Sequence, residues 1–214
     1  MKSQNLLRDS YNSLRGKWGK AVAVTLIYIS VFSVIGFIVG VISVISQGIF
    51  GLNQFEGELL TNLLSTPIQI ILAPPLLVGF IIFSLNVSRN SEPEISNLFL
   101  GFKKKWGKYI LATLLQSFLI VIGLIIFIIP GIIAGLMFSQ VFFILAEDDD
   151  IGLVEAFQKS ASMMKGNKTS LFLVNLIITG IYILGLFTCC IGFIFILPYQ
   201  YVVLAKFYDE VSNK

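Results

Sequence analysis

Residues 21–50 read AVAVTLIYISVFSVIGFIVGVISVISQGIF, thirty consecutive residues without a charged side chain. A helix that crosses a lipid bilayer needs about 20 apolar residues, so this stretch exceeds one perpendicular crossing. We predict a membrane helix here that either tilts or ends before Ser46-Gln47-Gly48. The stretch decides the class of protein, because an uncharged apolar run of this length is typical of a transmembrane helix.

The composition of the whole chain agrees with this stretch. Of the 214 residues, 56% are hydrophobic and only 13% are charged. At about 20 residues per crossing, this supplies material for roughly six membrane helices. The composition excludes a soluble domain, a disordered chain and a nucleic-acid-binding protein.

Five further uncharged stretches complete the six predicted transmembrane helices. They are residues 67–88, 109–129, 132–146, 169–187 and 191–205. Pro74 and Pro75 lie in the first half of one stretch and are expected to kink or delay its helix, because proline lacks a backbone donor. Pro130-Gly131 is expected to break the chain between the third and fourth crossings. We predict an all-α polytopic membrane protein.

Three polar segments carry apolar residues at helical spacing. They are residues 1–20, 89–108 and 151–164. In the first, the apolar positions are Leu6, Leu7, Tyr11, Leu14 and Trp18. Amphipathic helices of this kind lie in the plane of the membrane interface. We therefore expect one interfacial helix before each pair of crossings.

The basic residues give the orientation. Of the 15 Lys and Arg residues, five lie before the first crossing, five between the second and third, three between the fourth and fifth, and two after the sixth. Cytoplasmic segments of membrane proteins carry the excess of Lys and Arg. The pattern predicts cytoplasmic interfacial helices and cytoplasmic N- and C-termini.

A motif at the basic corners indicates an internal repeat. Lys17-Trp18-Gly19-Lys20 and Lys105-Trp106-Gly107-Lys108 match, and Lys165-Gly166-Asn167-Lys168 keeps the glycine and the final lysine. We predict one membrane domain, residues 1–214, built from three hairpin repeats of parallel sense. The repeats are residues 1–88, 89–146 and 147–214.

Several motifs together resemble a bacterial family of multipass membrane proteins known as domain of unknown function 975. They are Lys17-Trp18-Gly19-Lys20, Pro74-Pro75-Leu76, Ile129-Pro130-Gly131, Met164-Lys165-Gly166-Asn167-Lys168 and Pro198-Tyr199. The resemblance covers nearly the whole chain and departs from the family pattern at Asp149 and Thr169. It implies an α-helical protein of the bacterial plasma membrane without a catalytic motif. More distantly, the layout is similar to the membrane domain attached to some glycerophosphodiester phosphodiesterases.

The residue types narrow the chemistry. The chain has no histidine, and none of the predicted crossings contains a charged residue. Ion pathways and proton relays in membranes use such residues. We therefore expect no enzymatic activity, no cofactor and no metal site. The acidic run 147–150 leaves a divalent-cation site as the alternative to a solvated helix start.

Uncharged polar residues within the crossings are the candidate ligand-binding residues. They are Gln116, Gln140, Asn175 and Gln200. A neutral polar cavity is one interpretation, and hydrogen bonding between helices is the other. Seven glycines are expected to let helices approach closely. They are Gly36, Gly40, Gly79, Gly123, Gly135, Gly180 and Gly185.

The basic corners are candidate sites for anionic lipid headgroups. The residues concerned are Lys17, Trp18, Lys20, Lys103, Lys104, Lys105, Trp106 and Lys108. Each Lys or Arg near an anionic membrane surface contributes about 1 kcal/mol of attraction. The alternative is that these residues only determine topology.

Two functions are compatible with these features. The first is a non-enzymatic membrane protein that binds or moves a lipid-like or peptide ligand. The second is an accessory membrane protein that acts through a protein partner, as in bacteriocin immunity, export or envelope stress. Membrane lipids are partners in both cases, and the oligomeric state stays open.

Overall fold

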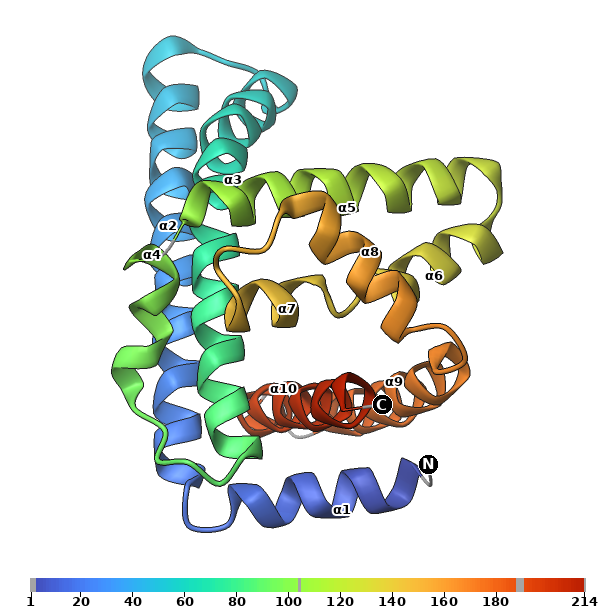
Figure 1. The fold of residues 1–214 in the computed structure, drawn as a ribbon. Helices are drawn as coiled ribbons and strands as arrows, with labels where there is room; N and C mark the ends of the chain where they lie inside the picture. Colours follow the sequence, from blue (N-terminus) through green and yellow to red (C-terminus); the bar gives the residue numbers. More distant parts are fainter. Residues whose placement is uncertain (1–2, 104, 188–190, 214) are drawn as a thin grey trace.

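A computed structural model describes residues 3–103, 105–187 and 191–213, and within these ranges every regular element is a helix (Figure 1). This confirms the all-α prediction. Five segments are long and apolar enough to cross a membrane: Trp18–Ile49, Gln54–Ser88, Trp106–Ile126, Ile128–Glu147 and Lys168–Leu186. The sixth crossing, expected in residues 191–205, stays a prediction.

The first helical pair is longer than predicted. After α1 (Ser3–Leu14), helix α2 (Trp18–Phe50) continues through residues 46–48 and ends at Gly51, whose φ of 64° favours glycine. Helix α3 (Gln54–Ser88) begins well before Pro67, where the sequence predicted the crossing to start. Asn53 and Glu56 form a capping box at its start, with bonds of 3.0 and 2.9 Å. The cap explains the early start, and α3 continues through Pro67, Pro74 and Pro75.

The prediction of one interfacial helix in residues 89–108 is wrong. The segment instead forms a 3-10 helix, η1 (Ile95–Phe99), and the short helix α4 (Leu100–Lys103). Both lie directly on the backbone of α3. A Cβ added at Gly79 would overlap the Leu98 carbonyl, and one added at Gly101 would overlap the Pro75 carbonyl. The segment therefore packs closely on the α3 backbone as two short helices, and it does not form one regular amphipathic helix.

The second helical pair is divided into three helices. Helix α5 (Trp106–Ile126) is followed by α6 (Ile128–Met137) and α7 (Val141–Glu147). Pro130 lies in the first turn of α6, where its missing N–H costs nothing. The chain is not helical at residues 138–140, so the predicted fourth crossing contains a break.

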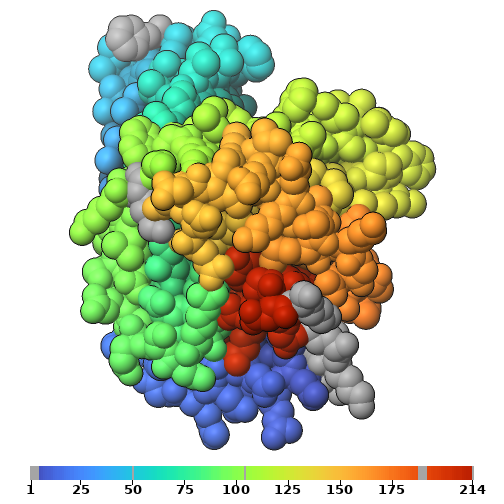
Figure 2. All heavy atoms as spheres, in the orientation of Figure 1, coloured from blue at the N-terminus to red at the C-terminus, as the bar shows by residue number. Residues whose placement is uncertain are grey.

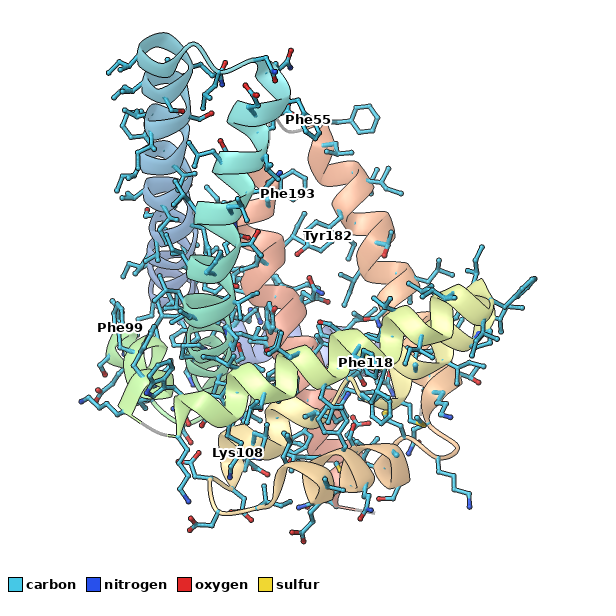
Figure 3. The ribbon with its side chains drawn as sticks, turned by 90° about the horizontal axis from the view of Figure 1, so that it is seen from above. Phe55, Phe99, Lys108, Phe118, Tyr182 and Phe193 are labelled. Atoms are coloured by element: carbon cyan, nitrogen blue, oxygen red, sulfur yellow. The ribbon has the colours of Figure 1, made fainter. Side chains whose placement is uncertain are left out.

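The remaining helices are α8 (Leu153–Met163), α9 (Lys168–Leu186) and α10 (Ile191–Ser212). Helix α8 confirms a helix within residues 151–164. The α5–α6 pair runs crosswise to α2 and α3 in both ribbon views (Figures 1 and 3). The α5–α6 pair and the α2–α3 pair therefore run in different directions. The threefold repeat stays a prediction.

Helix α3 is the centre of the packing. It contributes Phe80 to a buried cluster shared with α1, α2 and α10, and Val78 to a second cluster shared with α5, α7 and α8. Leu6 and Phe207 belong to a third cluster that joins α1, α9 and α10. The C-terminal half of α3 is consequently enclosed by protein.

Other apolar side chains face outward. Phe37 and Val44 of α2 are 74% and 71% exposed, and Ile125 of α5 is 79% exposed. Exposed side chains of this size on apolar helices require a lipid environment. The distribution supports a protein embedded in a membrane.

Candidate functional site

A cavity of about 260 Å³ lies between α9, α10 and the break that separates α6 from α7. It is lined by Ser139, Leu171, Asn175, Ile178, Thr179, Tyr182, Gln200 and Leu204. Two of the four predicted ligand-binding residues, Asn175 and Gln200, therefore face the same space. None of the lining residues carries a formal charge.

Part of the polar surface in this cavity is already hydrogen-bonded. The Tyr182 hydroxyl donates to Oε1 of Gln200 at 2.7 Å, and the Thr179 hydroxyl donates to the backbone oxygen of Asn175 at 2.8 Å. Tyr182 also stacks on Phe193 across the two helices, with ring centroids 5.6 Å apart (Figure 3). These contacts fix the side chains of Tyr182 and Gln200.

Other polar groups in the cavity have no partner among the described residues. They are the side-chain amide of Asn175 and the amide nitrogen of Gln200. Leu171, Ile178 and Leu204 supply apolar walls. An ion placed here would have no counter-charge in a low-dielectric region. The cavity therefore fits a neutral group that both donates and accepts hydrogen bonds.

Gln140 follows Ser139, which lines this cavity, and is hydrogen-bonded to it. Its side chain is fully buried, and its Nε2 donates to the Ser139 hydroxyl at 2.9 Å. Its Oε1 is buried without a partner. Leaving such an acceptor unpaired costs about 1–3 kcal/mol. The acceptor lies next to the cavity in the chain, but Gln140 is not among the residues that line it.

Helix α8 holds the break in place. The Ser160 hydroxyl donates to the backbone oxygen of Met137 at 2.8 Å and accepts from the backbone nitrogen of Gln140 at 3.3 Å. Non-helical backbone at membrane depth is tolerated where protein buries it or where it lines a cavity. Residues 138–140 meet both conditions, since Ser139 lines the cavity and Gln140 is buried.

Gln116 is not part of this site. It lies on α5, outside the lining of the α9–α10 cavity, and its Oε1 is buried without a partner. The structure thus brings together Asn175, Gln200 and, through Ser139, Gln140. The hydrogen-bonding interpretation holds for Oε1 of Gln200, which has Tyr182 as its partner.

Sequence reasoning missed a charged cluster at the ends of three helices. Arg89, just after α3, forms ion pairs with Glu147 of α7 and, at 2.6 Å, with Asp209 of α10. The Ser88 hydroxyl donates to Asp209 at 2.8 Å, and the Tyr208 hydroxyl donates to Glu147 at 2.5 Å. We call these five residues the Arg89 cluster.

Within the Arg89 cluster one guanidinium is shared by two carboxylates, so the cluster keeps a formal charge of −1. Hydrogen bonding to Asp209 and Glu147 raises the pKa of Arg89, with burial acting in the opposite direction. Burial, followed by the hydrogen bond to Glu147, raises the pKa of Tyr208. The sequence did contain one signal: charged residues follow the second crossing of each predicted hairpin, and these charges differ in sign. Their separations of 58 and 120 positions gave no indication that these charges meet.

The first basic corner binds the loop that follows α3. The Lys17 ammonium donates to the backbone oxygen of Ser91 at 2.9 Å, and Lys20 pairs with Glu92 at 3.1 Å. Trp18 packs inward, with ring centroids 6.1 Å from Tyr11 and 6.0 Å from Phe195. This corner is therefore used within the protein.

The second basic corner makes equivalent contacts with the loop that follows α7. Lys105 pairs with Asp150 at 2.8 Å, which lowers the pKa of that carboxyl group. Lys108 donates to the backbone oxygens of Asp149 and, at 2.8 Å, of Ile151 (Figure 3). Tyr109 donates to the Asp149 carboxylate at 2.8 Å.

These contacts also account for the acidic run 147–150. Three of its carboxylates contact Arg89, Tyr109 and Lys105. The fourth, of Asp148, accepts from the backbone nitrogens of Asp150 and Ile151 at 2.9 and 3.2 Å. In the parts of the chain that the structure describes, no group of three or more possible metal ligands gathers.

The predicted headgroup residues differ in whether they already have partners within the protein. Lys103 is exposed and the Trp106 side chain is 45% exposed, whereas Lys104 lies outside the described residues. Lys17, Lys20, Lys105 and Lys108 are occupied by protein partners. Headgroup binding at these corners stays a prediction. Among the candidate residues that the structure describes, only Lys103 and Trp106 lack such contacts.

Neither the curated proteins nor the solved structures contain a match to this chain. The model of a family described as protein of unknown function (DUF975) matches residues 1–129 and 116–214, which together span the chain. The chain therefore belongs to the DUF975 family.

Proposed function

We propose that this protein is a non-enzymatic, multipass membrane protein whose α9–α10 cavity binds the neutral polar part of a lipid-like or peptide ligand. One observation carries the proposal: the side-chain amide of Asn175 and the amide nitrogen of Gln200, without partners among the described residues, belong to the lining of an uncharged cavity with apolar walls. Ligand sites in proteins commonly combine an apolar lining with a few polar groups that orient the ligand. The buried acceptor of Gln140, reached through Ser139, adds a further polar group beside the cavity.

The cavity is tested by replacing Asn175 and Gln200 together with leucine. Losing two hydrogen bonds of about 0.5–1.5 kcal/mol each should weaken retention of a bound ligand about tenfold or more. The measurement is mass spectrometry of small molecules that co-purify with the protein from native membranes. Gln116→Leu is the matched control, because Gln116 lies on α5 outside the lining of the cavity.

A compound that the wild type and Gln116→Leu retain and the double variant loses supports the proposal. Equal retention by all three proteins contradicts it. A wild-type protein that carries no small molecule also contradicts it and favours the accessory role through a protein partner.

The topology belongs to the same proposal: six crossings in three hairpins, with both termini in the cytoplasm of a bacterium. The five apolar segments and the placement of all basic residues at one set of corners support it. The crosswise α5–α6 pair requires that this pair tilts strongly in the membrane or lies in a thinner part of it.

Cysteine labelling in intact cells tests the orientation. In a background in which Cys189 and Cys190 are serine, Asn53→Cys should react with a membrane-impermeant maleimide, and Lys103→Cys should react only after the cells are opened. Asn53 caps α3 at the predicted outer end, whereas Lys103 ends α4 at the predicted inner end. The reverse pattern would place both termini outside.

A further inference from the structure

The third basic corner differs from the first two. Lys165 belongs to this corner, and Lys159 lies on the preceding helix α8. Neither ammonium group has a hydrogen bond or an ion pair to any described residue. The lysines of the other two corners each bind a neighbouring loop. Within the described part of the chain, the two ammonium groups of Lys159 and Lys165 therefore have no direct ionic partner.

Both ammonium groups line one open cavity of about 450 Å³ between α8, the third corner and the end of α10. Its lining consists of Lys159, Ser162, Met163, Lys165, Asn167, Val211 and Ser212. It contains two cations and no carboxylate. Figure 2 shows the end of α10 at the surface, beside the orange region that contains α8. Lys159 and Lys165 are both exposed.

An adjacent cavity of about 600 Å³ shares Lys159 and Ser212 with it. Its carboxylates, Glu147 and Asp209, are held by Arg89 within the Arg89 cluster. Arg89 balances one of these two carboxylates, so one formal negative charge is left on the side of Lys159 that faces the larger cavity. The smaller cavity, with Lys159 and Lys165 and no carboxylate in its lining, still keeps an excess of positive charge. The field in the smaller cavity is positive, which favours an anion.

The position of this cavity indicates which anion it accepts. Helix α8 is amphipathic, and Met163 and Val211 give the cavity an apolar side. Phosphate groups of anionic lipids lie at the membrane interface, where nearby lysines attract them. We propose that the third corner binds a phosphate group, carried by an anionic phospholipid or free in solution. This proposal does not depend on the α9–α10 cavity.

The test uses the full chain in a neutral detergent and native mass spectrometry. The probes are phosphatidylglycerol, chain-matched phosphatidylcholine and inorganic phosphate. At about 1 kcal/mol for each lysine, converted at 1.4 kcal/mol per tenfold change, the double variant Lys159→Gln/Lys165→Gln should bind phosphatidylglycerol about 30-fold more weakly. The control Arg8→Gln/Arg15→Gln removes the same charge from two exposed residues of the N-terminal segment, away from this cavity.

The proposal predicts preference for phosphatidylglycerol over phosphatidylcholine, loss of that preference in the Lys159/Lys165 variant, and its retention in the control. Displacement by millimolar inorganic phosphate would assign the site to free phosphate, and no displacement would assign it to the lipid. Equal loss in both double variants would show a general effect of surface charge and overturn the proposal. Equal binding of both lipids by the wild type, without phosphate binding, would also overturn it. Circular dichroism and gel filtration establish that each variant is folded.

Discussion

Gly79→Ala is expected to destabilise the protein strongly, by about 3 kcal/mol or more. An added Cβ would overlap the Leu98 carbonyl, and this neighbour is backbone rather than a flexible side chain. Overpacking of a well-packed interior usually costs about 1–3 kcal/mol, and a backbone neighbour cannot adopt another rotamer to relieve it. The variant should therefore force η1 away from α3. The measurement is the unfolding temperature in detergent, followed by fluorescence-detected gel filtration.

Gly180→Ala is the matched control for this experiment. Gly180 also lies inside a long apolar helix, α9, but nothing lies within 4 Å of its added Cβ. Alanine there should be neutral or should stabilise the helix by about 0.5–1 kcal/mol. If Gly79→Ala unfolds at the same temperature as Gly180→Ala, the close contact between α3 and η1 is not present in the protein.

Arg89→Gln is expected to produce the second large loss of stability. Removing the guanidinium leaves the carboxylates of Glu147 and Asp209 without their shared cation. Exposed ion pairs contribute about 0–1 kcal/mol, and removing one partner of a buried pair costs about 3–5 kcal/mol. The side chains of Arg89, Glu147 and Asp209 are 43%, 34% and 23% exposed, so we expect about 1–3 kcal/mol.

The appropriate control is Arg15→Gln, the same substitution at an exposed residue between α1 and α2. The triple variant Arg89→Gln/Glu147→Gln/Asp209→Asn should recover part of the loss, because it removes the unpaired carboxylates as well. Unfolding temperatures measured side by side in the same detergent provide the comparison. If Arg89→Gln and Arg15→Gln are equally stable, the Arg89 cluster does not hold the three helix ends together.

The helical character of the chain was predictable because it depends on local composition. A run without charge such as 21–50 can satisfy its backbone in lipid only as a helix. Helix boundaries were less predictable where one polar residue decides them. The start of α3 at Gln54 depends on the capping box of Asn53 and Glu56, which lies before the uncharged stretch 67–88 that predicted the crossing.

The contacts between elements could not be predicted from residue types alone. All seven selected glycines suit close packing, yet Gly79, Gly123 and Gly185 meet neighbours, whereas Gly36, Gly40, Gly135 and Gly180 face open space. Polarity within a crossing identified Asn175 and Gln200 as cavity residues. It also selected Gln116, because the direction of a side chain depends on the crosswise packing of α5.

The contacts of the basic corners have a consequence for the order in which the protein is made. Lys17 and Lys20 bind residues 91 and 92, and Lys105 and Lys108 bind residues 149–151. Each helical pair therefore lacks its closing contacts until the ribosome has synthesised the first residues of the next segment. These contacts can therefore form only in order from the N-terminus, one helical pair at a time. The closing contacts of a pair become possible when the first residues of the next segment have been synthesised.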